Sequence, residues 1–253
     1  MRTILLGLVY LVLIFFLFIA LLICWPFGVR EPLLAIAKWA MDVGLKILGI
    51  RVDISGREAV DKKTRYVFMA NHLSFIDGPM LFRLIPQSVR VILKKSVFRI
   101  PIVGQGMRFV GFVPVDRKGI RGGKQSIETA GRLMRDRGYS YLVFPEGTRS
   151  RDGRIQAFRR GGFFLAIEAG APIVPISITG TFALMPKGSM FARSGRVRVR
   201  FHPPLPTQRY SRETMGGLMT EVKAAIESGL QETGSTSPRP NEVPSIPPRI
   251  RSS

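Results

Sequence analysis

The heptapeptide Asn71-His72-Leu73-Ser74-Phe75-Ile76-Asp77 holds an imidazole and a carboxylate five positions apart. The ordinary pKa of histidine suits proton transfer near neutral pH, so a His72–Asp77 pair could take a proton from a hydroxyl group. Residues five apart on an ideal helix are separated by about 140°, which keeps the two side chains apart if both lie in one helix. We therefore expect His72 to lie in a turn before the helix that contains Asp77.

The spacing Ser74-x-x-Asp77 is typical of a capping box, with Ser74 as the N-cap and Asp77 in the first turn. Asp77 could then accept a hydrogen bond from one ring nitrogen of His72 and leave the other nitrogen as the base. Backbone amides of the turn after Asn71 are candidate donors to an oxyanion. A purely structural interpretation, in which Ser74 and Asp77 only cap a helix, fits this heptapeptide equally well.

A second polar cluster, Phe144-Pro145-Glu146-Gly147-Thr148-Arg149-Ser150, follows the apolar run Tyr141–Val143. Gly147 allows close approach of a ligand to the backbone, Thr148 offers a hydroxyl donor, and Arg149 offers a planar guanidinium. This combination suits a phosphate. The alternative, a solvated basic loop, fits the further arginines that follow Arg149.

Other polar residues complete the candidate set. Glu146 lies among cations, so we expect it to orient an arginine or a substrate hydroxyl. Asp116-Arg117 also ends an apolar run, and Arg117 is a further candidate phosphate ligand. His202 stands alone before Pro203, and His72 has no partner at a zinc-like interval, so we expect no metal site.

Composition indicates a basic protein with anionic partners. The chain has 253 residues, 46% of them hydrophobic, and a net charge of +21. A single α/β domain of this size can bury a full core. Nucleic acid, a lipid surface and phosphorylated substrates all fit the charge. Few aromatic residues interleave with the basic ones, which disfavours a nucleic-acid partner.

The N-terminal segment favours a membrane. Thr3 to Trp25 carries no charge and would form a helix about 35 Å long, enough to cross a bilayer core of about 30 Å. It is too long for the core of a signal peptide, and no small-x-small cleavage site follows before Pro26. We therefore predict a membrane anchor over residues 1–50, made of a helix over 3–25 and an amphipathic helix over 33–50.

The second helix, over Leu33–Ile50, has its charges on one stripe, at Lys38, Asp42 and Lys46. It could lie in the membrane interface with Trp39 near the headgroups, or cover the core of the domain as an ordinary amphipathic helix. Positive charge is much heavier after the anchor than before it, which favours a cytoplasmic domain on the inner membrane. The single Cys24 excludes an intrachain disulfide and fits a reducing compartment.

Residues 51–232 alternate short apolar runs with helical stretches, which predicts a largely parallel sheet in an α/β domain. Residues 233–253 are rich in Pro and Ser and end in basic residues, so we predict a disordered tail. Alternating charge over Arg196–Phe201 suggests an edge strand. The expected strands are Val52–Ser55, Tyr66–Ala70, Val89–Leu93, Phe109–Val115, Tyr139–Phe144, Ile173–Ile178 and Arg196–Phe201, and the expected helices are Phe75–Leu84, Gly123–Arg137, Phe158–Ala169 and Arg212–Leu230.

Four blocks in order resemble the glycerolipid acyltransferases, in particular those that acylate 1-acyl-sn-glycerol 3-phosphate. The blocks are Asn-His-x-Ser-x-x-Asp from Asn71, Gly-x-x-x-Val-Asp-Arg from Gly111, Phe-Pro-Glu-Gly-Thr-Arg-Ser from Phe144, and Val174-Pro175-Ile176. The resemblance runs from about Val52 to Phe201. It implies a glycerol-3-phosphate acyltransferase-like αβα domain.

The resemblance also implies roles by position. His72 is the general base and Asp77 orients it, while the acceptor's glycerol phosphate is bound by Glu146, Gly147, Thr148 and Arg149, assisted by Arg117 and Lys94. The implied reaction moves an acyl group from acyl-CoA or acyl-acyl carrier protein to the sn-2 hydroxyl of lysophosphatidic acid. The product is phosphatidic acid for phospholipid synthesis.

No cofactor is implied beyond the thioester co-substrate, and the implied partners are the lysolipid, the thioester, membrane lipids and acyl carrier protein. No Gly-x-Ser-x-Gly elbow occurs and the domain has no cysteine, so direct transfer is expected. Two alternatives stay open. One is a different lysophospholipid or lyso-aminolipid acceptor, and the other is a non-catalytic module that binds anionic lipid through its basic face.

Overall fold

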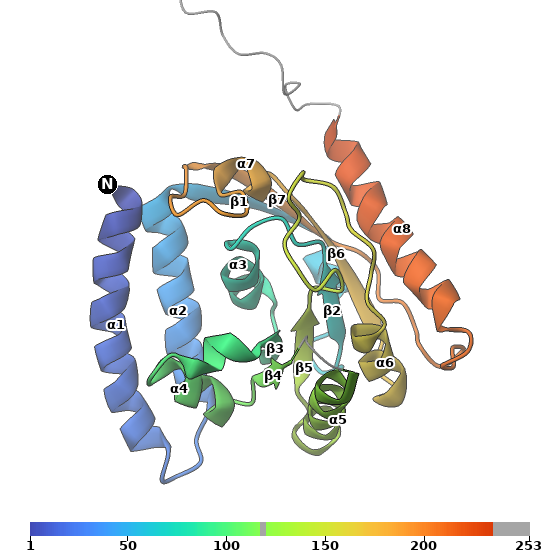
Figure 1. Cartoon of the computed structure of the whole chain (residues 1–253), viewed down its shortest axis with the longest axis horizontal. Helices are drawn as coiled ribbons and strands as arrows, with labels where there is room; N and C mark the ends of the chain where they lie inside the picture. The colour runs from blue at the N-terminus through green and yellow to red at the C-terminus, as the bar shows by residue number, and fades with distance from the viewer. Residues whose placement is uncertain (117–119, 235–253) are drawn as a thin grey trace, which may run out of the picture.

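The computed structural model describes residues 1–116 and 120–234, in which helices cover both faces of one central sheet (Figure 1). One face packs against α1, α2, α3 and α4, and the other against α5, α6 and α8. The helices are α1 (Arg2–Cys24), α2 (Glu31–Leu48), α3 (Asp77–Leu84), α4 (Val103–Phe109), α5 (Ile120–Arg137), α6 (Gly161–Glu168), α7 (Thr181–Leu184) and α8 (Met215–Gly234), with short 3-10 helices η1 (Arg57–Ala59) and η2 (Lys95–Arg99).

The sheet has seven strands in the order β1-β7-β6-β2-β5-β3-β4. Every neighbouring pair is parallel except β6 and β7, so the prediction of a largely parallel α/β fold is confirmed. The strands are β1 (Ile50–Ser55), β2 (Val67–Ala70), β3 (Val89–Lys94), β4 (Val113–Val115), β5 (Ser140–Val143), β6 (Ile173–Thr179) and β7 (Gly195–Phe201).

The central strands are apolar along their whole length because helices cover both of their faces. All four residues of β2 are buried, and so are the first six of β6. Continuous apolar runs are typical of parallel strands buried on both sides. The centre of the sheet is therefore fixed by β2 and β6, and His72 follows β2 directly.

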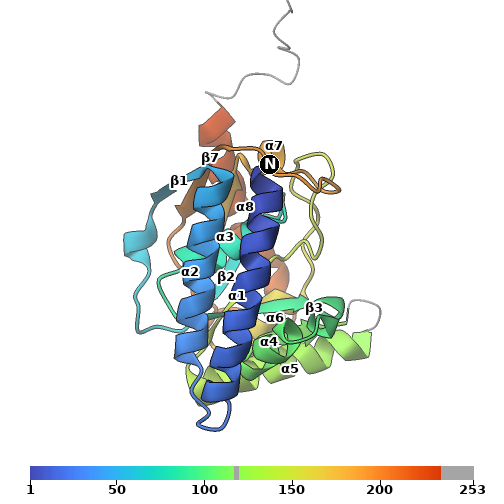
Figure 2. The same cartoon turned by 90° about the vertical axis from the view of Figure 1, so that its left-hand side faces the viewer.

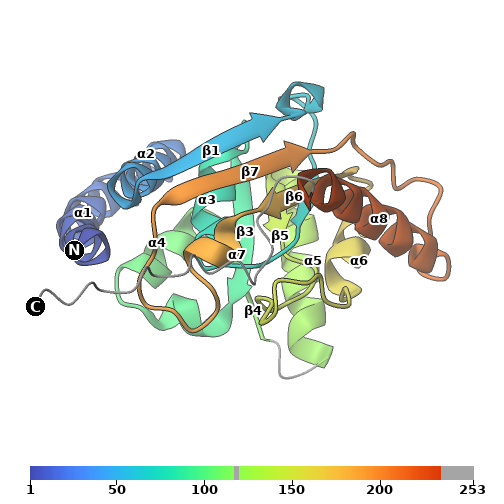
Figure 3. The same ribbon diagram turned by 90° about the horizontal axis from the view of Figure 1, so that it is seen from above.

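The expectation that Arg196–Phe201 is an edge strand was wrong. β7 lies between β6 and β1, and Arg196 is in register with Arg51 of β1 (Figure 3). The charged residues that alternate along β7 lie on a solvated face of the sheet. A strand with one solvated face can still have a hydrogen-bonded neighbour on each side.

The segment Phe109–Val115 was also predicted incorrectly as one strand. Phe109 ends α4, and the strand begins only at Val113 because Gly111 adopts a φ of +93°. A β-carbon on Gly111 would lie 2.8 Å from the Tyr139 ring, so glycine is required at this turn. The shorter β4 leaves Asp116 at the same sheet edge as the ends of the other parallel strands.

The two N-terminal helices pack side by side along one flank of the domain (Figures 1 and 2). α1 is the one helix in the described ranges that is long and apolar enough to cross a membrane by length and composition. One side of it packs into the protein, where Leu21 is buried and Trp25 stacks on Phe109 with ring centroids 5.0 Å apart. Near its start, Tyr10 donates a hydrogen bond to the Ala40 carbonyl of α2 (3.2 Å).

Two charged residues of α2, Lys38 and Asp42, bond to the domain, while the Lys46 side chain is mostly exposed. Lys38 donates to the carbonyls of Ile85 and Gln87 beyond the end of α3, at 3.1 and 2.8 Å. Asp42 pairs with Lys46 of its own helix and Arg83 of α3. Leu33, Leu34 and Leu48 of α2 belong to the same core as α3. The structure shows this helix packed on the core of the domain, and its position relative to a membrane stays a prediction.

The Asn71 side chain continues the pairing of β2 with β6 beyond the end of β2. Its amide nitrogen donates to the Ile178 carbonyl (2.9 Å), and its amide oxygen accepts from the Ile178 N–H (2.8 Å). The side chain is fully buried. It thereby satisfies two backbone groups that water cannot reach, and it fixes the point at which the chain leaves the sheet.

Replacing Asn71 with Ala should lower the free energy of unfolding by about 2–4 kcal/mol, because both backbone groups of Ile178 lose their partner inside the protein. Urea denaturation followed by circular dichroism measures the change. Gln125→Ala on the exposed side of α5 is the matched control, with an expected change below about 0.5 kcal/mol. Equal changes in both variants would contradict the structural role of Asn71.

Candidate active site

Most of the predicted site residues meet at one edge of the sheet. The parallel strands β2, β5, β3 and β4 all end there, and His72, Phe144, Lys94 and Asp116 lie at or just beyond their last residues. Open parallel sheets bind ligands at this edge. The strand order brings the first and third sequence blocks together because β2 and β5 are neighbours.

His72 lies in the turn between β2 and α3, as predicted. Its Nδ1 is 3.0 Å from Oδ2 of Asp77, and the Asp77 side chain is fully buried at the start of α3. The same oxygen accepts the backbone N–H groups of Leu73 and Ser74, both at 2.7 Å. One carboxylate oxygen therefore holds both the turn and the orientation of the imidazole ring.

The predicted capping box is half present. Asp77 accepts the Ser74 N–H as a capping box requires, but α3 begins at Asp77, and the Ser74 hydroxyl accepts from Ile76 at 3.2 Å. That hydroxyl donates to the Met185 carbonyl (2.7 Å). The expectation that amides just after Asn71 bind an oxyanion is not supported, since the N–H groups of residues 72–74 already donate to carboxylates.

The imidazole is clamped on one face and accessible along its edge. The Phe144 ring stacks on it with centroids 4.0 Å apart and an angle of 19° between the planes. The His72 side chain keeps 18% of its surface exposed. In the described ranges Nε2 has no hydrogen-bond partner, so this nitrogen is available to a substrate proton.

Glu146 holds two backbone segments together. Its Oε1 accepts the His72 N–H (2.7 Å) and its Oε2 accepts the Gln156 N–H (3.0 Å), while the residue is only 3% exposed. Burial raises the pKa of this carboxyl group, and the two N–H groups oppose that rise. The geometry makes Glu146 a positioning residue for the His72 turn, where the sequence had suggested a ligand of the acceptor.

The loop after β5 carries cations on the side of α3. Lys187 donates to the Thr148 hydroxyl (3.0 Å) and to the Arg149 carbonyl (3.2 Å). The Arg149 guanidinium lies 5.9 Å from the centre of the Phe75 ring. No carboxylate pairs with Arg149 or Lys187 within residues 1–116 and 120–234. These two cations can receive an anion beside His72.

Arg159 is a candidate functional residue that the sequence interpretation missed. A β-carbon on Gly147 would lie 2.7 Å from its Nε, so the arginine passes directly over the glycine, which has a φ of +72°. The Arg159 N–H donates to the Pro145 carbonyl (2.8 Å). Its guanidinium is exposed and makes no ion pair with any described residue. The only sequence signal was its place in a run of arginines after Arg149.

An open groove of about 1020 Å³ begins at the wall formed by Phe144. It lies on the face of the sheet that α5 and α6 cover, with apolar side chains on its floor and cations on its rim. Its lining includes Ile92, Val143, Phe164 and Met215, and Lys124, Arg159 and Arg160. Phe144 lines this groove and also stacks on His72, so a single ring lies between the groove and the candidate base.

Of the two remaining predicted ligands, the structure describes only Lys94. Lys94 is the exposed last residue of β3, in register with Val115 of β4. Arg117 lies outside the described residues, as does the predicted tail beyond Gly234. In the described part of the chain, no cluster of three or more acidic, histidine or cysteine side chains could hold a metal ion.

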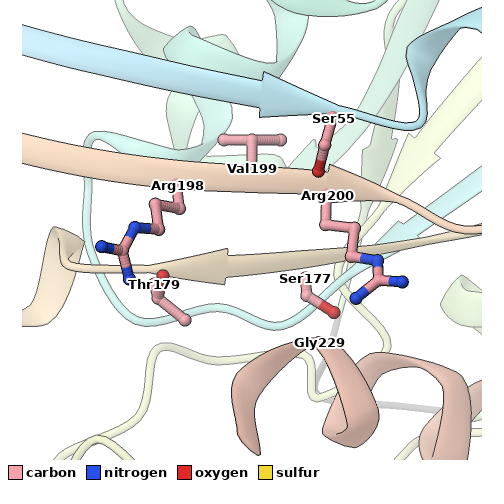
Figure 4. A pocket seen from close by; sticks show the side chains of 7 residues that line it. All are labelled: Ser55, Ser177, Thr179, Arg198, Val199, Arg200 and Gly229. Carbon is pink, nitrogen blue, oxygen red and sulfur yellow. The ribbon is translucent and has the colours of Figure 1, made fainter. Parts of the chain in front are cut away.

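The arginines of β7 lie on a different part of the molecule. Arg198 and Arg200 line a small pocket of about 280 Å³ with Ser177 of β6 and Gly229 of α8 (Figure 4). His202 lies behind it, with Nε2 2.7 Å from the Ser177 hydroxyl, which donates to the Ile226 carbonyl. The second histidine of the chain therefore joins α8 to the sheet and is separate from His72.

Comparison with known proteins matches the region of the chain that contains the four sequence blocks. The Acyltransferase family model matches residues 51–179, a segment that contains every predicted site residue. The 1-acyl-sn-glycerol-3-phosphate acyltransferase of Borreliella burgdorferi is 30% identical over 190 residues, which cover 75% of each chain. That of Saccharomyces cerevisiae is 32% identical over 206 residues, covering 80% of this chain and 67% of its own.

Chloroplast relatives and a solved structure extend the comparison. The chloroplastic 1-acyl-sn-glycerol-3-phosphate acyltransferase LPAT1 of Arabidopsis thaliana is 38% identical over 157 residues, 61% of this chain and 44% of its own. This chain thus spans about half the length of several plant relatives. The fold matches the crystal structure of a Thermotoga maritima 1-acyl-sn-glycerophosphate acyltransferase, with a TM-score of 0.70, 24% identity, and coverage of 94% of this chain and 100% of that one.

Glu146→Gln should lower the free energy of unfolding by about 1–3 kcal/mol, because one of the two buried N–H groups loses its acceptor. Urea denaturation checks this value. The control is Glu168→Gln, which removes an exposed ion pair with Arg212 and should cost no more than about 1 kcal/mol. A Glu146→Gln variant as stable as the control would contradict the positioning role.

Proposed function

Because this chain belongs to the Acyltransferase family, we propose that it transfers an acyl group from a thioester to the sn-2 hydroxyl of lysophosphatidic acid. The named activity of its relatives supports this acceptor. The observation that carries the proposal is the 3.0 Å contact of His72 Nδ1 with buried Asp77, which leaves Nε2 without a partner among the described residues. The product is phosphatidic acid.

In the proposed reaction, His72 Nε2 takes the proton of the acceptor hydroxyl as its oxygen attacks the thioester carbonyl carbon. Asp77 stabilises the imidazolium that forms. The carbon–sulfur bond then breaks, and the departing thiolate takes the proton from His72. An ester and a free thiol result, and no protein group other than the imidazole has to change its protonation state.

Direct transfer is favoured over an acyl-enzyme. A serine nucleophile needs its hydroxyl proton accepted by a base. The proton of Ser74 is used on the Met185 carbonyl, and the hydroxyl has no contact with His72. Ser74 therefore supports the turn, and the acceptor hydroxyl reacts without a covalent intermediate.

Replacing His72 with Ala should lower kcat by about 10²–10⁴-fold, since general-base catalysis supplies a factor of that size. Thiol release from acyl-CoA with lysophosphatidic acid present measures the rate. Ser74→Ala should keep kcat within about tenfold of the wild type, because only a supporting hydrogen bond is lost. Abolished turnover in folded Ser74→Ala with retained turnover in His72→Ala would contradict direct transfer.

The two substrates are proposed to approach from opposite faces of the sheet. Arg149 and Lys187 lie on the α3 side and suit the phosphate of a lipid. The groove with Arg159 opens on the side of α5 and α6, away from α1 (Figure 1). A water-soluble donor can enter there, with its acyl chain on the apolar floor and a phosphate of acyl-CoA or acyl carrier protein on the rim.

Arg149→Ala should raise KM for lysophosphatidic acid by about 10–100-fold, and Arg159→Ala should raise KM for the acyl donor by a similar factor. Each factor corresponds to one lost hydrogen bond to a charged group. Initial rates measured while each substrate is varied separate the two effects, and each variant is the control of the other. If both variants raise KM for the same substrate, the proposal that the two substrates bind on opposite faces of the sheet is overturned.

Membrane association supports the use of a lipid acceptor. α1 exposes an apolar outer side, while its other side is packed on α2, which carries Glu31, Lys38 and Asp42. Spanning the bilayer would draw these charges into hydrocarbon, which is costly. We therefore propose that α1 lies along one leaflet, with the domain at the cytoplasmic face of the inner membrane.

A further inference from the structure

The loop between α7 and β7 presents two large apolar side chains to solvent. Met190 is 79% exposed and Phe191 is 61% exposed. The loop is ordered by its own hydrogen bonds, because the Ser189 hydroxyl donates to the Phe191 carbonyl (2.8 Å) and accepts the Phe191 N–H (3.2 Å). A structured turn that exposes adjacent apolar side chains indicates an interaction surface when it joins a larger apolar patch.

The larger patch is the outer side of α1. The N–H of Ala192 donates to the Thr3 hydroxyl at the start of that helix (3.2 Å). Ile4, Leu5 and Leu8, in the first two turns of α1, are exposed. The apolar tip of the loop therefore continues the apolar side of α1 beyond its N-terminal end.

The two segments that form this patch carry only positive charges. Lys187 and Arg193 flank the loop tip, and Arg2 stands at the start of α1. Residues 1–30 and 180–195 contain no Asp or Glu. Apolar side chains flanked by cations match the surface of an anionic bilayer, whose acyl chains lie below negative headgroups. A protein partner gives no reason for residues 1–30 and 180–195 both to carry only positive charges, whereas an anionic membrane does.

The same loop is bonded to the candidate active site. The Met185 carbonyl accepts from Ser74, in the turn that holds His72 (2.7 Å). Lys187 donates to the Thr148 hydroxyl and the Arg149 carbonyl in the phosphate loop. A displacement of the loop would therefore move both the base and the anion-binding cations.

We propose that Met185–Ser194 is a second membrane-inserting element, which seats Met190 and Phe191 among the acyl chains of the leaflet that holds α1. The insertion fixes the depth of Arg149 and His72 at the level of the headgroups, where a lysolipid keeps its phosphate and its free hydroxyl. The inference rests on the proposed lipid acceptor. It adds a second contact with the bilayer, at the entrance to the site.

Site-specific fluorescence tests the insertion directly. In a Cys24→Ala background, Phe191→Cys labelled with an environment-sensitive dye should shift to the blue on vesicles of phosphatidylcholine and phosphatidylglycerol, and lipids with quenchers on their acyl chains should quench it. Ser228→Cys on α8, on the far side of the molecule, should do neither (Figures 1 and 3). Phe15→Cys on the exposed side of α1 is the positive control.

The labels at positions 15, 191 and 228 distinguish insertion of the loop from membrane association through α1. A response at position 15 with none at 191 would overturn the loop proposal and leave the membrane-bound acyltransferase intact. No response at either position would overturn both the loop insertion and the membrane association. Responses at 15 and 191 together, with none at 228, are the expected result.

Kinetics supply an independent readout. The double variant Met190→Ser, Phe191→Ser should lose about tenfold or more in kcat/KM on lysophosphatidic acid in vesicles, because two apolar side chains no longer leave water. With a short-chain, water-soluble lysophosphatidic acid it should match the wild type. Ile54→Ser, which trims an exposed apolar residue of β1, should match the wild type in both assays. An equal loss on both acceptors, or no loss on vesicles, would overturn the proposal.

Discussion

The buried carboxylate of Asp77 is the contact on which the site depends. Taking a charge out of water costs several kcal/mol unless hydrogen bonds replace the water, and three donors converge here on one oxygen. Two of them are backbone N–H groups, so the charge that orients His72 also folds the turn that carries it. The turn and the ring share one acceptor, and the stacked Phe144 ring and Glu146 add further support.

Glu146 repeats this arrangement one strand away. It connects the His72 turn to the segment at Gln156, so the first and third sequence blocks are bonded through a buried carboxylate. With only 17 acidic residues against 38 basic ones, the chain uses two carboxylates inside the site. Arg149 and Arg159 are left on its two sides without a carboxylate partner in the described ranges, which keeps them available to phosphates of the substrates.

The sheet divides these cations between two environments. Its α3 face adjoins α1 and the Met185–Ser194 loop, the side on which we propose that the lipid arrives. Its α5 face holds the open groove, which reaches the solvent. Phe144 lines the groove and stacks on His72, so in the proposed reaction the thioester and the hydroxyl would approach His72 around the edge of this one ring. Proximity of this kind supplies a large part of the rate enhancement in a two-substrate reaction.

The sequence by itself determined the largely parallel sheet, the place of His72 ahead of its helix and its pairing with Asp77, because these follow from local periodicity and from residues five apart. It did not determine that β7 lies inside the sheet, that Lys38 and Asp42 of α2 bond to the domain, or that Glu146 accepts the His72 N–H. Those features depend on partners 30 or more residues away, such as the Lys38 contacts with Ile85 and Gln87 and the Glu146 contact with His72. Arg159 is the clearest example of a feature that local sequence does not determine. It lies over Gly147 only because the loop after β5 folds back on itself. Local patterns fix which element forms, and only tertiary packing decides which neighbour each polar side chain meets.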